Sequence, residues 1–395
     1  KPSYLSAFAV NKYQSLTLGI DATNLRQGGG LQHILAILQH FDPERDGFDR
    51  IILWAPPSTL DSLPDTPWLF KSHYPVFERG FIRRGLWQWR ELPREATKAG
   101  VHLMFIPGGS APGGFQPAVV MFQNLLPFDA TAFKLMQPSI LQQIRLKVLG
   151  FIYKYSLRRA TGLIFLSAFA KGRIIASVGQ TSVADVVIPH GIDASFKSAP
   201  RHHRYIEDCH PSNPFRLLYV SAIDFYKHPW QVVEAVAVLR TATGWPLKLI
   251  LAGPATSELA LARLQSAMRR FDPAGSFVEY LGEVPHADMP ALYASADMAV
   301  FASTCENLPM IVLEKMAMGL PIACSEYPAM RALLGEDAVW FDPASIASVA
   351  EALRALISDP QRRVEISQHN RSKAASYDWD RVTRETFKFL RGRVG

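Results

Sequence analysis

The stretch Ser303–Gly319, STCENLPMIVLEKMAMG, decides how this chain is expected to fold. An apolar run, Met298 to Phe301, precedes it and is typical of a buried strand, and a short polar loop follows the strand. Pro309 is expected at the first helical position and Gly319 at the helix end, because helices favour these residues there. The stretch therefore predicts a strand, a loop and a helix.

Two glutamates occupy special places in this unit. Glu306 lies in the loop just outside the helix N-terminus, and Glu314 lies in the second helical turn. Helical side chains lean toward the N-terminus, so both carboxylates can face the crevice at the strand's carboxyl end. Free N–H groups near Leu308 and Met310 would form an anion site there. A ligand with hydroxyl groups on both sides of a diphosphate, such as a nucleotide sugar, suits this arrangement; an ordinary unit with two surface charges is the alternative.

Length and composition predict a folded protein of two domains. The chain has 395 residues, of which 48% are hydrophobic and 19% charged, which is typical of globular domains and not of disorder. No apolar run reaches the roughly 18–20 residues that span a bilayer, and residues 1–14 show no signal-peptide pattern. The three cysteines, Cys209, Cys305 and Cys324, have no metal-ligand spacing and favour a reducing cytoplasm.

The excess of Lys and Arg over Asp and Glu lies in the first half of the chain. Residues 1–195 hold 20 Lys and Arg against 13 Asp and Glu, whereas residues 196–395 are balanced at 22 against 22. An acidic partner for the first half is expected: nucleic acid, anionic lipid and a phosphorylated acceptor fit, and a basic but unpartnered surface is the alternative. Residues 80–99 and 137–160 mix aromatic side chains with Arg and Lys, as a membrane-surface helix would or as ordinary domain helices can.

The first half alternates apolar runs with helical stretches. Its first strand, Ser15–Asp21, is followed by a glycine turn, Gly28–Gly30, and a helix expected at Leu31–Gln39. Glycines in such a turn let backbone N–H groups approach a ligand closely. Further strands are expected at Arg50–Trp54, His102–Ile106, Ala118–Phe122, Gly162–Leu166 and Ala184–Ile188. The alternation predicts an α/β domain with a mainly parallel sheet.

A linker precedes the second half. Residues 194–214 lack periodicity, and their cluster of His202, His203, His210 and Cys209 fits no zinc spacing, so solvated linker residues are expected. The second half begins again with a strand, Leu217–Val220, and continues as another α/β unit. Further strands are expected at Leu247–Ala252, Val278–Leu281, Met298–Phe301, Pro321–Cys324 and Ala338–Phe341.

Two charged positions in the second half are interpreted from their place on the expected elements. Lys227 lies just before a helix N-terminus at a strand's carboxyl end, where it can act as a point charge for phosphate. Asp378 and Asp380 form an Asp-x-Asp pattern that could hold a metal, but no strand precedes it and a helix follows. We interpret it as a helix cap and expect no metal site.

Taken together, the motifs resemble those of the retaining glycosyltransferases of family 4, which have the GT-B fold. The resemblance is strong over residues 215–345 and extends over 16–195 in layout only. It rests on the segment Tyr219–Lys227, on Leu281-Gly-Glu-Val-Pro285 together with Leu292–Asp297, and on Glu306-x7-Glu314. It implies two Rossmann-like, doubly wound domains that face a central cleft. The expected divisions are an N-terminal domain at 1–193, a linker at 194–214, a nucleotide-sugar domain at 215–375 and a helix crossing back at 376–395.

The resemblance also implies the roles of individual residues. Glu306 would face the hydroxyls of the donor sugar, Glu314 the ribose, and Lys227 the diphosphate. Glu306 and Lys227 are the expected catalytic residues. The expected donor-binding set is Gly29, Gly30, Asn124, Ser221, Lys227, Gly253, Val284, Glu306, Asn307, Leu308, Pro309 and Glu314.

The chain departs from the family pattern at two places. The family usually has Gly-Arg where this chain has Ser221-Ala222, so one of two cationic phosphate partners is missing. Many members have a His after the strand that corresponds to Ala118–Phe122, and here Asn124 is expected to take its role toward the donor sugar.

The resemblance implies a retaining, metal-independent hexosyltransferase without a cofactor. Its donor would be a nucleotide diphosphate sugar, GDP-mannose or a UDP-hexose, and its acceptor a glycan hydroxyl, lipid-diphosphate-linked as in surface-polysaccharide assembly. The expected location is the cytoplasm, peripheral at the inner face of the membrane, with the basic first half on anionic lipid and no nucleic-acid partner.

Other interpretations of the same fold stay open. A nucleotide-sugar epimerase would need acid and base groups in the cleft, and a phosphorylase would need a lysine for pyridoxal phosphate. An inactive nucleotide-sugar-binding or membrane-docking protein is the alternative outside the enzymes.

Overall fold

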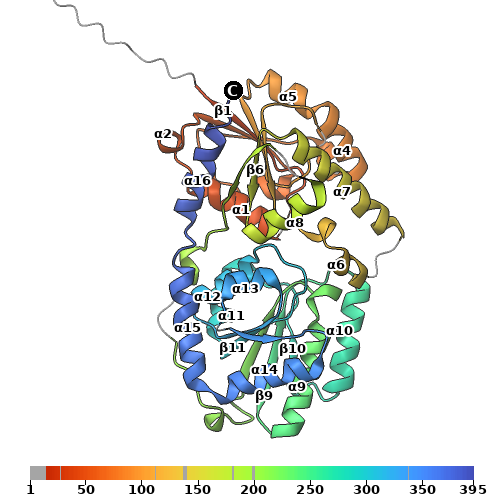
Figure 1. The fold of residues 1–395 in the computed structure, drawn as a ribbon, viewed down its shortest axis with the longest axis vertical. Coiled ribbons are helices and arrows are strands. Elements are labelled where there is room, and N and C mark those ends of the chain that lie inside the picture. Colours follow the sequence, from red (N-terminus) through yellow and green to blue (C-terminus); the bar gives the residue numbers. More distant parts are fainter. Residues whose placement is uncertain are drawn as a thin grey trace, which may run out of the picture.

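The structure is a computed structural model that describes residues 15–26, 28–111, 113–136, 140–179, 182–197, 201–336 and 338–395. The segment in which no signal peptide is expected, residues 1–14, lies outside these ranges. Within them the chain forms two lobes, one above the other in Figure 1, with a waist between them. Each lobe is built on its own parallel sheet.

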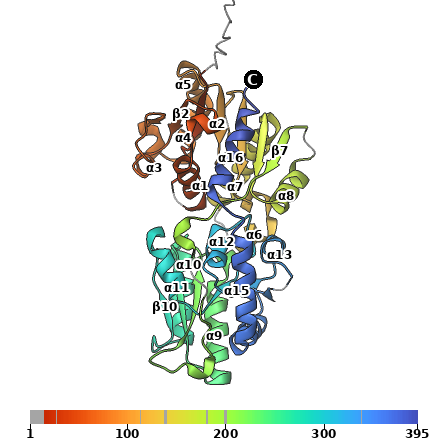
Figure 2. The ribbon, with the colours of Figure 1, turned by 90° about the vertical axis from the view of Figure 1, so that its left-hand side faces the viewer.

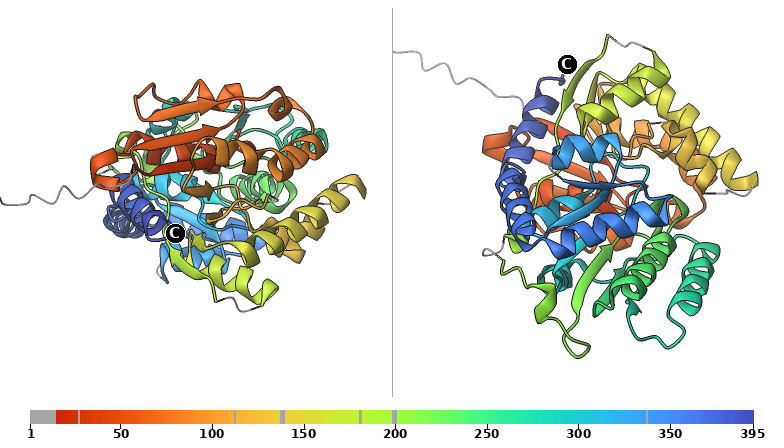
Figure 3. Two further views of the ribbon diagram at one scale, coloured as in Figure 1. Left: turned by 90° about the horizontal axis from the view of Figure 1, so that it is seen from above. Right: turned by 60° about the horizontal axis from the view of Figure 1, so that its bottom comes forward.

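The N-terminal lobe contains a seven-stranded sheet in the order β3-β2-β1-β4-β5-β6-β7, in which every neighbouring pair is parallel. Its strands are β1 (Thr17–Asp21), β2 (Arg50–Trp54), β3 (Leu69–Ser72), β4 (Leu103–Ile106), β5 (Ala118–Phe122), β6 (Gly162–Phe165) and β7 (Ala184–Val187). Its helices are α1 (Gly28–Gln39), α2 (Pro43–Asp46), α3 (Pro57–Leu60), α4 (Phe81–Arg90), α5 (Leu92–Lys98), α6 (Ala130–Leu135), α7 (Ile140–Arg159) and α8 (Ala168–Val178). Helix α7, yellow in both views of Figure 3, projects from the body of this lobe.

The C-terminal lobe contains a six-stranded parallel sheet in the order β10-β9-β8-β11-β12-β13. Its strands are β8 (Phe215–Val220), β9 (Leu247–Ala252), β10 (Val278–Tyr280), β11 (Met298–Phe301), β12 (Ile322–Ser325) and β13 (Val339–Phe341). Its helices are α9 (Pro229–Thr243), α10 (Glu258–Phe271), α11 (Met289–Ala294), α12 (Met310–Ala317), α13 (Pro328–Leu334), α14 (Ile346–Ser358) and α15 (Pro360–Ala374). The chain order changes direction at β8 and β11, and open parallel sheets bind ligands at such a switch point.

The central strands of both sheets are apolar without interruption because helices cover both of their faces. Every residue of β4, β5 and β11 is buried. A parallel sheet enclosed in this way shows continuous apolar runs instead of an alternating pattern. This explains why β4, β5 and β11 can be predicted from the sequence to within one residue; β8, predicted at Leu217–Val220, begins two residues earlier at Phe215.

The last helix, α16 (Trp379–Arg391), returns to the N-terminal lobe. Figures 1 and 2 show α15 along the lower lobe and α16 continuing upward beside α1 and α2. The side chain of Phe387 is fully buried, with ring centroids 4.6 Å from Phe41 and 6.1 Å from Phe48. The predicted crossing helix is therefore part of the N-terminal core.

The Asp-x-Asp motif acts at the start of this helix, as the sequence predicts. The Asp378 carboxylate accepts a hydrogen bond from the backbone N–H of Arg381 at 3.0 Å and caps α16. Asp380 in the first turn pairs with Arg45 of the N-terminal lobe at 2.6 Å. The Asp378 carboxylate therefore caps the helix, and the Asp380 carboxylate holds the helix against the N-terminal lobe.

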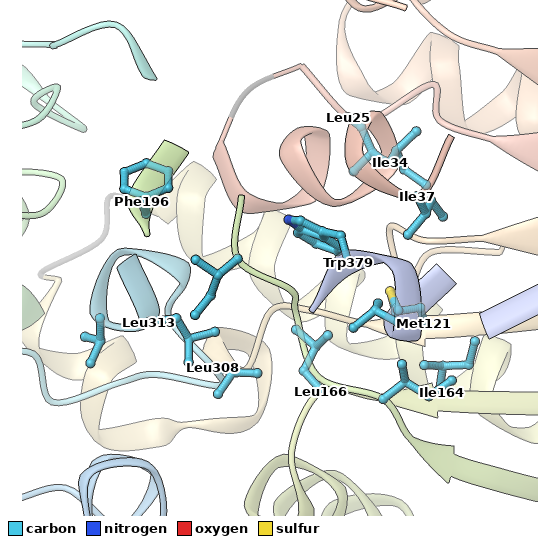
Figure 4. Close-up of a cluster of buried hydrophobic side chains, with 14 of the residues drawn as sticks. Leu25, Ile34, Ile37, Met121, Ile164, Leu166, Phe196, Leu308, Leu313 and Trp379 are labelled. Atoms are coloured by element: carbon cyan, nitrogen blue, oxygen red, sulfur yellow. The ribbon is translucent and has the colours of Figure 1, made fainter. Parts of the chain in front are cut away.

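A continuous apolar cluster joins the lobes at the waist. Figure 4 shows Leu25, Ile34 and Ile37 of the upper lobe, Trp379 at the start of α16, and Leu308 and Leu313 of the lower lobe in one region. All of them belong to a single buried cluster. Because the burial of apolar area is the main driving force of folding, this cluster holds the lobes together at the cleft.

Four expectations about local structure need correction. Gly28–Gly30 do not precede the first helix but form its first turn, and Pro309 precedes α12 as its N-cap instead of occupying its first position. The helix expected over 80–99 is broken at Glu91, because the pyrrolidine of Pro93 fits only the start of a second helix, α5. Strand β3 is absent from the sequence prediction; it is a four-residue edge strand with an exposed Phe70. The start of the helix expected at 137 lies outside the described residues.

Candidate active site

Two adjoining cavities lie in the cleft between the lobes. One, of about 540 Å³, is lined mainly by the N-terminal lobe and is called the N-lobe cavity. The other, of about 560 Å³, is lined mainly by the C-terminal lobe and is called the C-lobe cavity. Gly29, Met310 and Ile311 line both. The cavities are therefore neighbouring parts of one binding cleft.

Two helix N-termini face each other where the cavities meet. Gly28 and Gly29 open α1, and Met310 opens α12. A Cβ atom added to Gly29 would stand 3.6 Å from the Met310 sulfur, so the side chain of Met310 reaches the first turn of α1. The first N–H groups of a helix have no intrahelical partner and carry the positive end of its dipole. Two such ends around one space make a strong site for an anion such as a diphosphate.

Lys227 and Glu306 form an ion pair beside this junction. Glu306 lines the N-lobe cavity, whereas Lys227 lines neither cavity and has a side chain that is about 10% exposed. Burial alone would lower the pKa of Lys227, but the Glu306 carboxylate raises it above its ordinary value. Lys227 is therefore charged and directed at Glu306. Its predicted contact with phosphate stays a prediction.

Glu314 lies on the wall of the C-lobe cavity with two partners. The Tyr293 hydroxyl donates to one of its oxygens at 2.8 Å, and the His286 Nε2 atom lies 3.2 Å from the other. The hydrogen bond to Glu314 raises the pKa of His286. Two carboxylate lone-pair directions stay available to a ligand in the cavity, since a carboxylate offers about four. The wall can thus accept hydrogen bonds from a hydroxyl-bearing ligand.

Three further predicted residues line the C-lobe cavity: Ser221, Gly253 and Val284. Gly253 has a φ of 135°, and a Cβ atom there would stand 2.1 Å from the Ser221 carbonyl oxygen, so only glycine fits. The Ser221 hydroxyl is buried and has no hydrogen-bond partner among the described residues. An unsatisfied hydroxyl on the wall is available to a ligand.

Asn307 connects the lobes next to Glu306. Its amide nitrogen donates to the carbonyl oxygen of Phe122 at 3.0 Å, and its amide oxygen lies 3.1 Å from the Ser167 hydroxyl. The sequence resemblance assigns this residue to the donor. The structure shows that its side chain fixes the Glu306 loop against the ends of β5 and β6.

Asn124 and the glycines complete the N-lobe cavity. Asn124, Gly29 and Gly30 line it, together with Leu308 and Pro309 of the Glu306 loop. The Asn124 amide oxygen accepts from the N–H of Leu126 at 2.9 Å, which closes a local turn after β5. Apart from Lys227, each predicted site residue therefore lines one of the two cavities.

The structure adds cavity residues that the sequence does not reveal. They are Arg26, Arg84, Arg145, His286 and, as the partner of Glu314, Tyr293. Tyr293 and His286 lie in or beside segments already identified, but no rule of spacing singles them out. The arginines come from three separate elements of the basic half, so only their folded positions show that they converge.

Two unusual groups lie in the C-terminal lobe outside the residues that line its cavity. His228 adopts a left-handed φ of 53° before α9, and burial lowers its pKa to about 4. Lys315 follows Glu314, is fully buried and donates to the Val220 carbonyl oxygen at 3.1 Å. Burial lowers the pKa of Lys315 to about 7. A strained backbone and buried groups with a shifted pKa are found near functional sites more often than elsewhere.

A pair of buried histidines closes the back of the N-lobe cavity. The Nδ1 atoms of His33 and His190 are 3.0 Å apart, and His190 lines the cavity. Burial lowers the pKa of both, that of His190 to about 3, so both rings are neutral. Elsewhere in the part of the chain that the structure describes, no three His, Cys, Asp or Glu side chains gather as a metal site would require, the linker cluster included.

Sequence comparison finds a family match in the second half of the chain. Residues 207–373 match the family model of glycosyl transferases group 1. The O-antigen chain mannosyltransferase B of Escherichia coli is 26% identical over 169 residues, which are 43% of this chain and 44% of that protein. The chain spans about half the length of the curated relatives it matches.

Structural comparison extends the likeness to both lobes. The sucrose-phosphate synthase of Thermosynechococcus elongatus superimposes with a TM-score of 0.74 at 15% identity, over 95% of this chain and 98% of the other. An Anabaena protein crystallised with UDP-glucose gives a TM-score of 0.71 at 17% identity, over 95% and 100%. The chain therefore has the GT-B fold, with two Rossmann-like α/β lobes, and its residues 207–373 match the glycosyl transferases group 1 family model.

Proposed function

We propose that this chain is a retaining glycosyltransferase of family 4 that moves a hexose from a nucleotide diphosphate sugar to a hydroxyl of a glycan acceptor. One observation carries the proposal: Glu306 and Glu314 line two adjoining cavities at the point where the N-termini of α1 and α12 face each other. The likeness to group 1 glycosyl transferases over 207–373 supports it.

The cleft offers a place for each part of such a donor. The C-lobe cavity would take the nucleoside, with the ribose hydroxyls on Glu314. The diphosphate would lie between the two helix N-termini, and the hexose would extend into the N-lobe cavity toward Glu306. The remaining volume of the N-lobe cavity would receive the acceptor.

Transfer breaks the bond between the anomeric carbon and the diphosphate oxygen and forms a new bond from the acceptor oxygen on the same face of the sugar. Negative charge then grows on the departing diphosphate, where the N–H groups of α1 and α12 and the Lys227 ammonium would stabilise it. Pre-oriented donors of this kind usually lower the reaction barrier more than any other single effect. The leaving phosphate oxygen takes the proton of the acceptor hydroxyl, so neither a protein base nor a metal is required. Glu306 positions the sugar and is not the nucleophile.

The names of relatives guide the choice of donor. The E. coli relative is a mannosyltransferase, and the Anabaena protein was crystallised with UDP-glucose, so GDP-mannose and UDP-glucose are the donors to test first. An acceptor carried on a lipid diphosphate would bring the enzyme to a membrane surface. Support comes from α4 and α7, which border the N-lobe cavity and expose Ile82, Leu86, Trp89, Ile140, Ile144, Val148 and Phe151 among basic side chains. No helix within the described ranges is long and apolar enough to span a bilayer.

Thermal-shift measurements with GDP-mannose, UDP-glucose and ADP-glucose test the donor site, because a ligand at one hundred times its Kd stabilises the folded state by about 2.7 kcal/mol. The donor that binds is then used with glycan acceptors, with release of nucleoside diphosphate as the readout and EDTA in a parallel assay. NMR of the anomeric proton shows whether configuration is retained. EDTA-sensitive transfer, or an inverted product, would contradict the proposed mechanism.

Glu306→Gln removes the charge that positions the donor and faces Lys227, while preserving the shape of the side chain. We expect kcat to fall by about 10²–10³, the usual size for the loss of one interaction with the reacting group. The matched control is Glu326→Gln, since Glu326 is exposed and lies outside both cavities. Near wild-type transfer by Glu306→Gln under saturating donor would refute the role of Glu306.

The same assays separate the other possibilities. A nucleotide sugar that binds and never releases nucleoside diphosphate, with every acceptor tried, indicates a binding protein. A donor sugar converted at C2 without an acceptor indicates an epimerase, for which the neutral His190 on the cavity wall would be the group to examine.

A further inference from the structure

Three arginines converge on the cleft and form no ion pair with the carboxylates that the structure describes. Arg84 and Arg145 line the N-lobe cavity, and Arg26 lines the adjoining C-lobe cavity. The charges of Arg26 and Arg145, after burial, help to lower the pKa of Arg84, which shows that the three lie close together. None of the three forms an ion pair with any carboxylate of the described ranges. Like charges held side by side are unfavourable unless an anion joins them.

Each of the three arginine side chains contacts uncharged groups of the protein. Arg26 donates to the carbonyl oxygen of Phe77, and Arg145 lies over the ring of Phe81 at 5.5 Å. Both arginines are exposed at the cavity rim, whereas Arg84 is partly buried on its wall. The positive charge of the cluster is therefore available to a ligand.

A chain of hydrogen bonds orients Arg84. The Arg84 Nε atom donates to the Asn24 amide oxygen at 3.2 Å, and the Asn24 amide nitrogen donates to Gln88 at 3.3 Å. Gln88 in turn donates to the Asp21 carboxylate at 2.8 Å, and its side chain is buried. A second Arg84 nitrogen donates to the carbonyl oxygen of Arg79 at 3.2 Å. Side chains locked in this way are typical of a prepared binding site.

We propose that Arg84, with Arg145 and Arg26, forms a phosphate subsite that recognises an acceptor carrying a phosphate or diphosphate group. This inference rests on the proposed function, because it assigns the N-lobe cavity to the acceptor. The donor diphosphate has its own place between the α1 and α12 N-termini. Guanidinium groups suit this role, since their planar forks match phosphate oxygens in paired hydrogen bonds. The subsite would admit phosphorylated or diphosphate-linked acceptors and favour them over neutral glycans.

Inorganic pyrophosphate is the probe for a test by isothermal titration calorimetry on the full chain. The titration is done in the presence of a saturating nucleoside diphosphate, GDP or UDP, whichever the chain binds, so that the donor site is occupied. We expect pyrophosphate to bind beside the nucleotide. Arg84→Gln should weaken this binding about 10–100-fold, the size expected for hydrogen bonds to a charged group. Arg145→Gln, at the rim, should weaken it less.

Arg83→Gln is the matched control, because Arg83 is the preceding residue of α4, is exposed and lines neither cavity. It should bind pyrophosphate like the wild type. Asn24→Ala removes the group that orients Arg84 without removing a charge, and it should weaken binding several-fold. Circular dichroism and melting temperature confirm that each variant is folded.

Three outcomes would overturn the proposal. Competition between pyrophosphate and the nucleotide would assign the arginines to the donor diphosphate. Equal binding by Arg84→Gln and wild type would remove Arg84 from the site. Loss of sedimentation with phosphatidylglycerol vesicles in Arg84→Gln, without any pyrophosphate binding by wild type, would make the cluster a lipid headgroup site. If neither GDP nor UDP binds, the proposed transferase function fails, while pyrophosphate titrated alone still tests the arginines.

Discussion

The two cavities of the cleft differ in the charged side chains that line them. In the C-lobe cavity the carboxylate of Glu314 is held by Tyr293 and His286, and the wall presents oxygen acceptors and a free Ser221 hydroxyl. Among the described residues of the N-lobe cavity Glu306 is the sole carboxylate, and arginines on neutral supports border it. The hydroxyl-accepting wall of one side suits the proposed nucleoside, and the arginines beside the other suit the proposed phosphorylated acceptor.

The difference also shows how each side is built. The C-lobe cavity takes its polar groups from the ends of neighbouring strands, as parallel sheets usually arrange them. The N-lobe cavity takes its two arginines from α4 and α7, and Arg26 of the loop before α1 lines the adjoining cavity. The first kind of site follows from the fold, whereas the second depends on surface helices that can vary without disturbing the sheet. We expect specificity for the acceptor to reside in the second.

Lys315→Met tests the buried cation that follows Glu314 and should have the largest effect on stability. Burial lowers the pKa of Lys315 to about 7, whereas the unfolded chain has the ordinary value of 10.5. Below pH 7 the folded state therefore contains a buried charge, at a cost on the order of 5 kcal/mol, and methionine removes that cost. The variant should have a higher free energy of unfolding at pH 6, measured with urea.

The unfolding free energy of the wild type should rise with pH because of Lys315. Between about pH 7 and 10.5 the unfolded wild type binds a proton at Lys315 that the folded state does not, so its unfolding free energy rises with pH by up to about 1.4 kcal/mol per unit. The advantage of the variant should shrink over the same range. A constant difference from pH 6 to 9 would show that Lys315 keeps one charge state. Lys248→Met, at an exposed surface pair, is the control.

Glu314→Gln tests the hydroxyl-binding side of the comparison. We expect the KM for the donor to rise about 10–100-fold with a smaller change in kcat, because a hydrogen bond to a charged group contributes about 1.5–3 kcal/mol. Glu279→Gln, exposed and outside the cavity, should leave KM unchanged. A fall in kcat at constant KM would instead place Glu314 at the reacting bond.

The same variant should alter the titration of His286. The Glu314 hydrogen bond raises the pKa of His286, so the protonated ring stabilises the fold below its ordinary pKa of 6.5, and this contribution is lost as pH rises through the raised value. In Glu314→Gln the imidazole pKa, followed by NMR, should fall. The stability difference from wild type should be greatest at acidic pH and shrink above the raised pKa.

The double variant Ile82→Ser, Phe151→Ser tests whether the surface of α4 and α7 beside the N-lobe cavity binds a membrane. These side chains are 75% and 72% exposed on α4 and α7. Each would bury apolar area in a bilayer interface, so their loss should lower sedimentation with phosphatidylglycerol vesicles several-fold. Leu259→Ser is the control, since Leu259 is 59% exposed on α10 of the other lobe. Equal sedimentation of all variants would show that these side chains do not bind the membrane, and the basic half would then serve a soluble acceptor.

Much of the fold can be predicted because local sequence and burial agree. Runs such as Ala118–Phe122 and Leu247–Ala252 are apolar in all or nearly all positions and bounded by turn residues, and both strands have those bounds in the structure. The edge strand at Leu69–Ser72 escapes prediction because it is short and carries Lys71, so its apolar signal is weak. Gly28–Gly30 favour a turn because glycine is a poor helix former, yet packing of α1 against the waist overrides this propensity.

The candidate site is predictable where its residues are contiguous in the chain. The spacing from Glu306 to Glu314 places both on the cleft because a short loop and about one helical turn separate them. The Lys227–Glu306 pair and the bridge from Asn307 to Phe122 join positions 79 and 185 residues apart. Single-sequence patterns carry no signal for such contacts, and the same holds for the three arginines.

The return of α16 to the first lobe has a consequence for how the protein can be made. The buried Phe387 packs on Phe41 and Phe48, so the N-terminal core is closed by residues synthesised more than three hundred positions later. During translation the C-terminal lobe can finish folding first, whereas the lobe that emerges first must wait with apolar surface uncovered. A fragment ending before Trp379 would retain that exposed surface, and a shorter piece of the N-terminal lobe would fold only if α16 were attached to it.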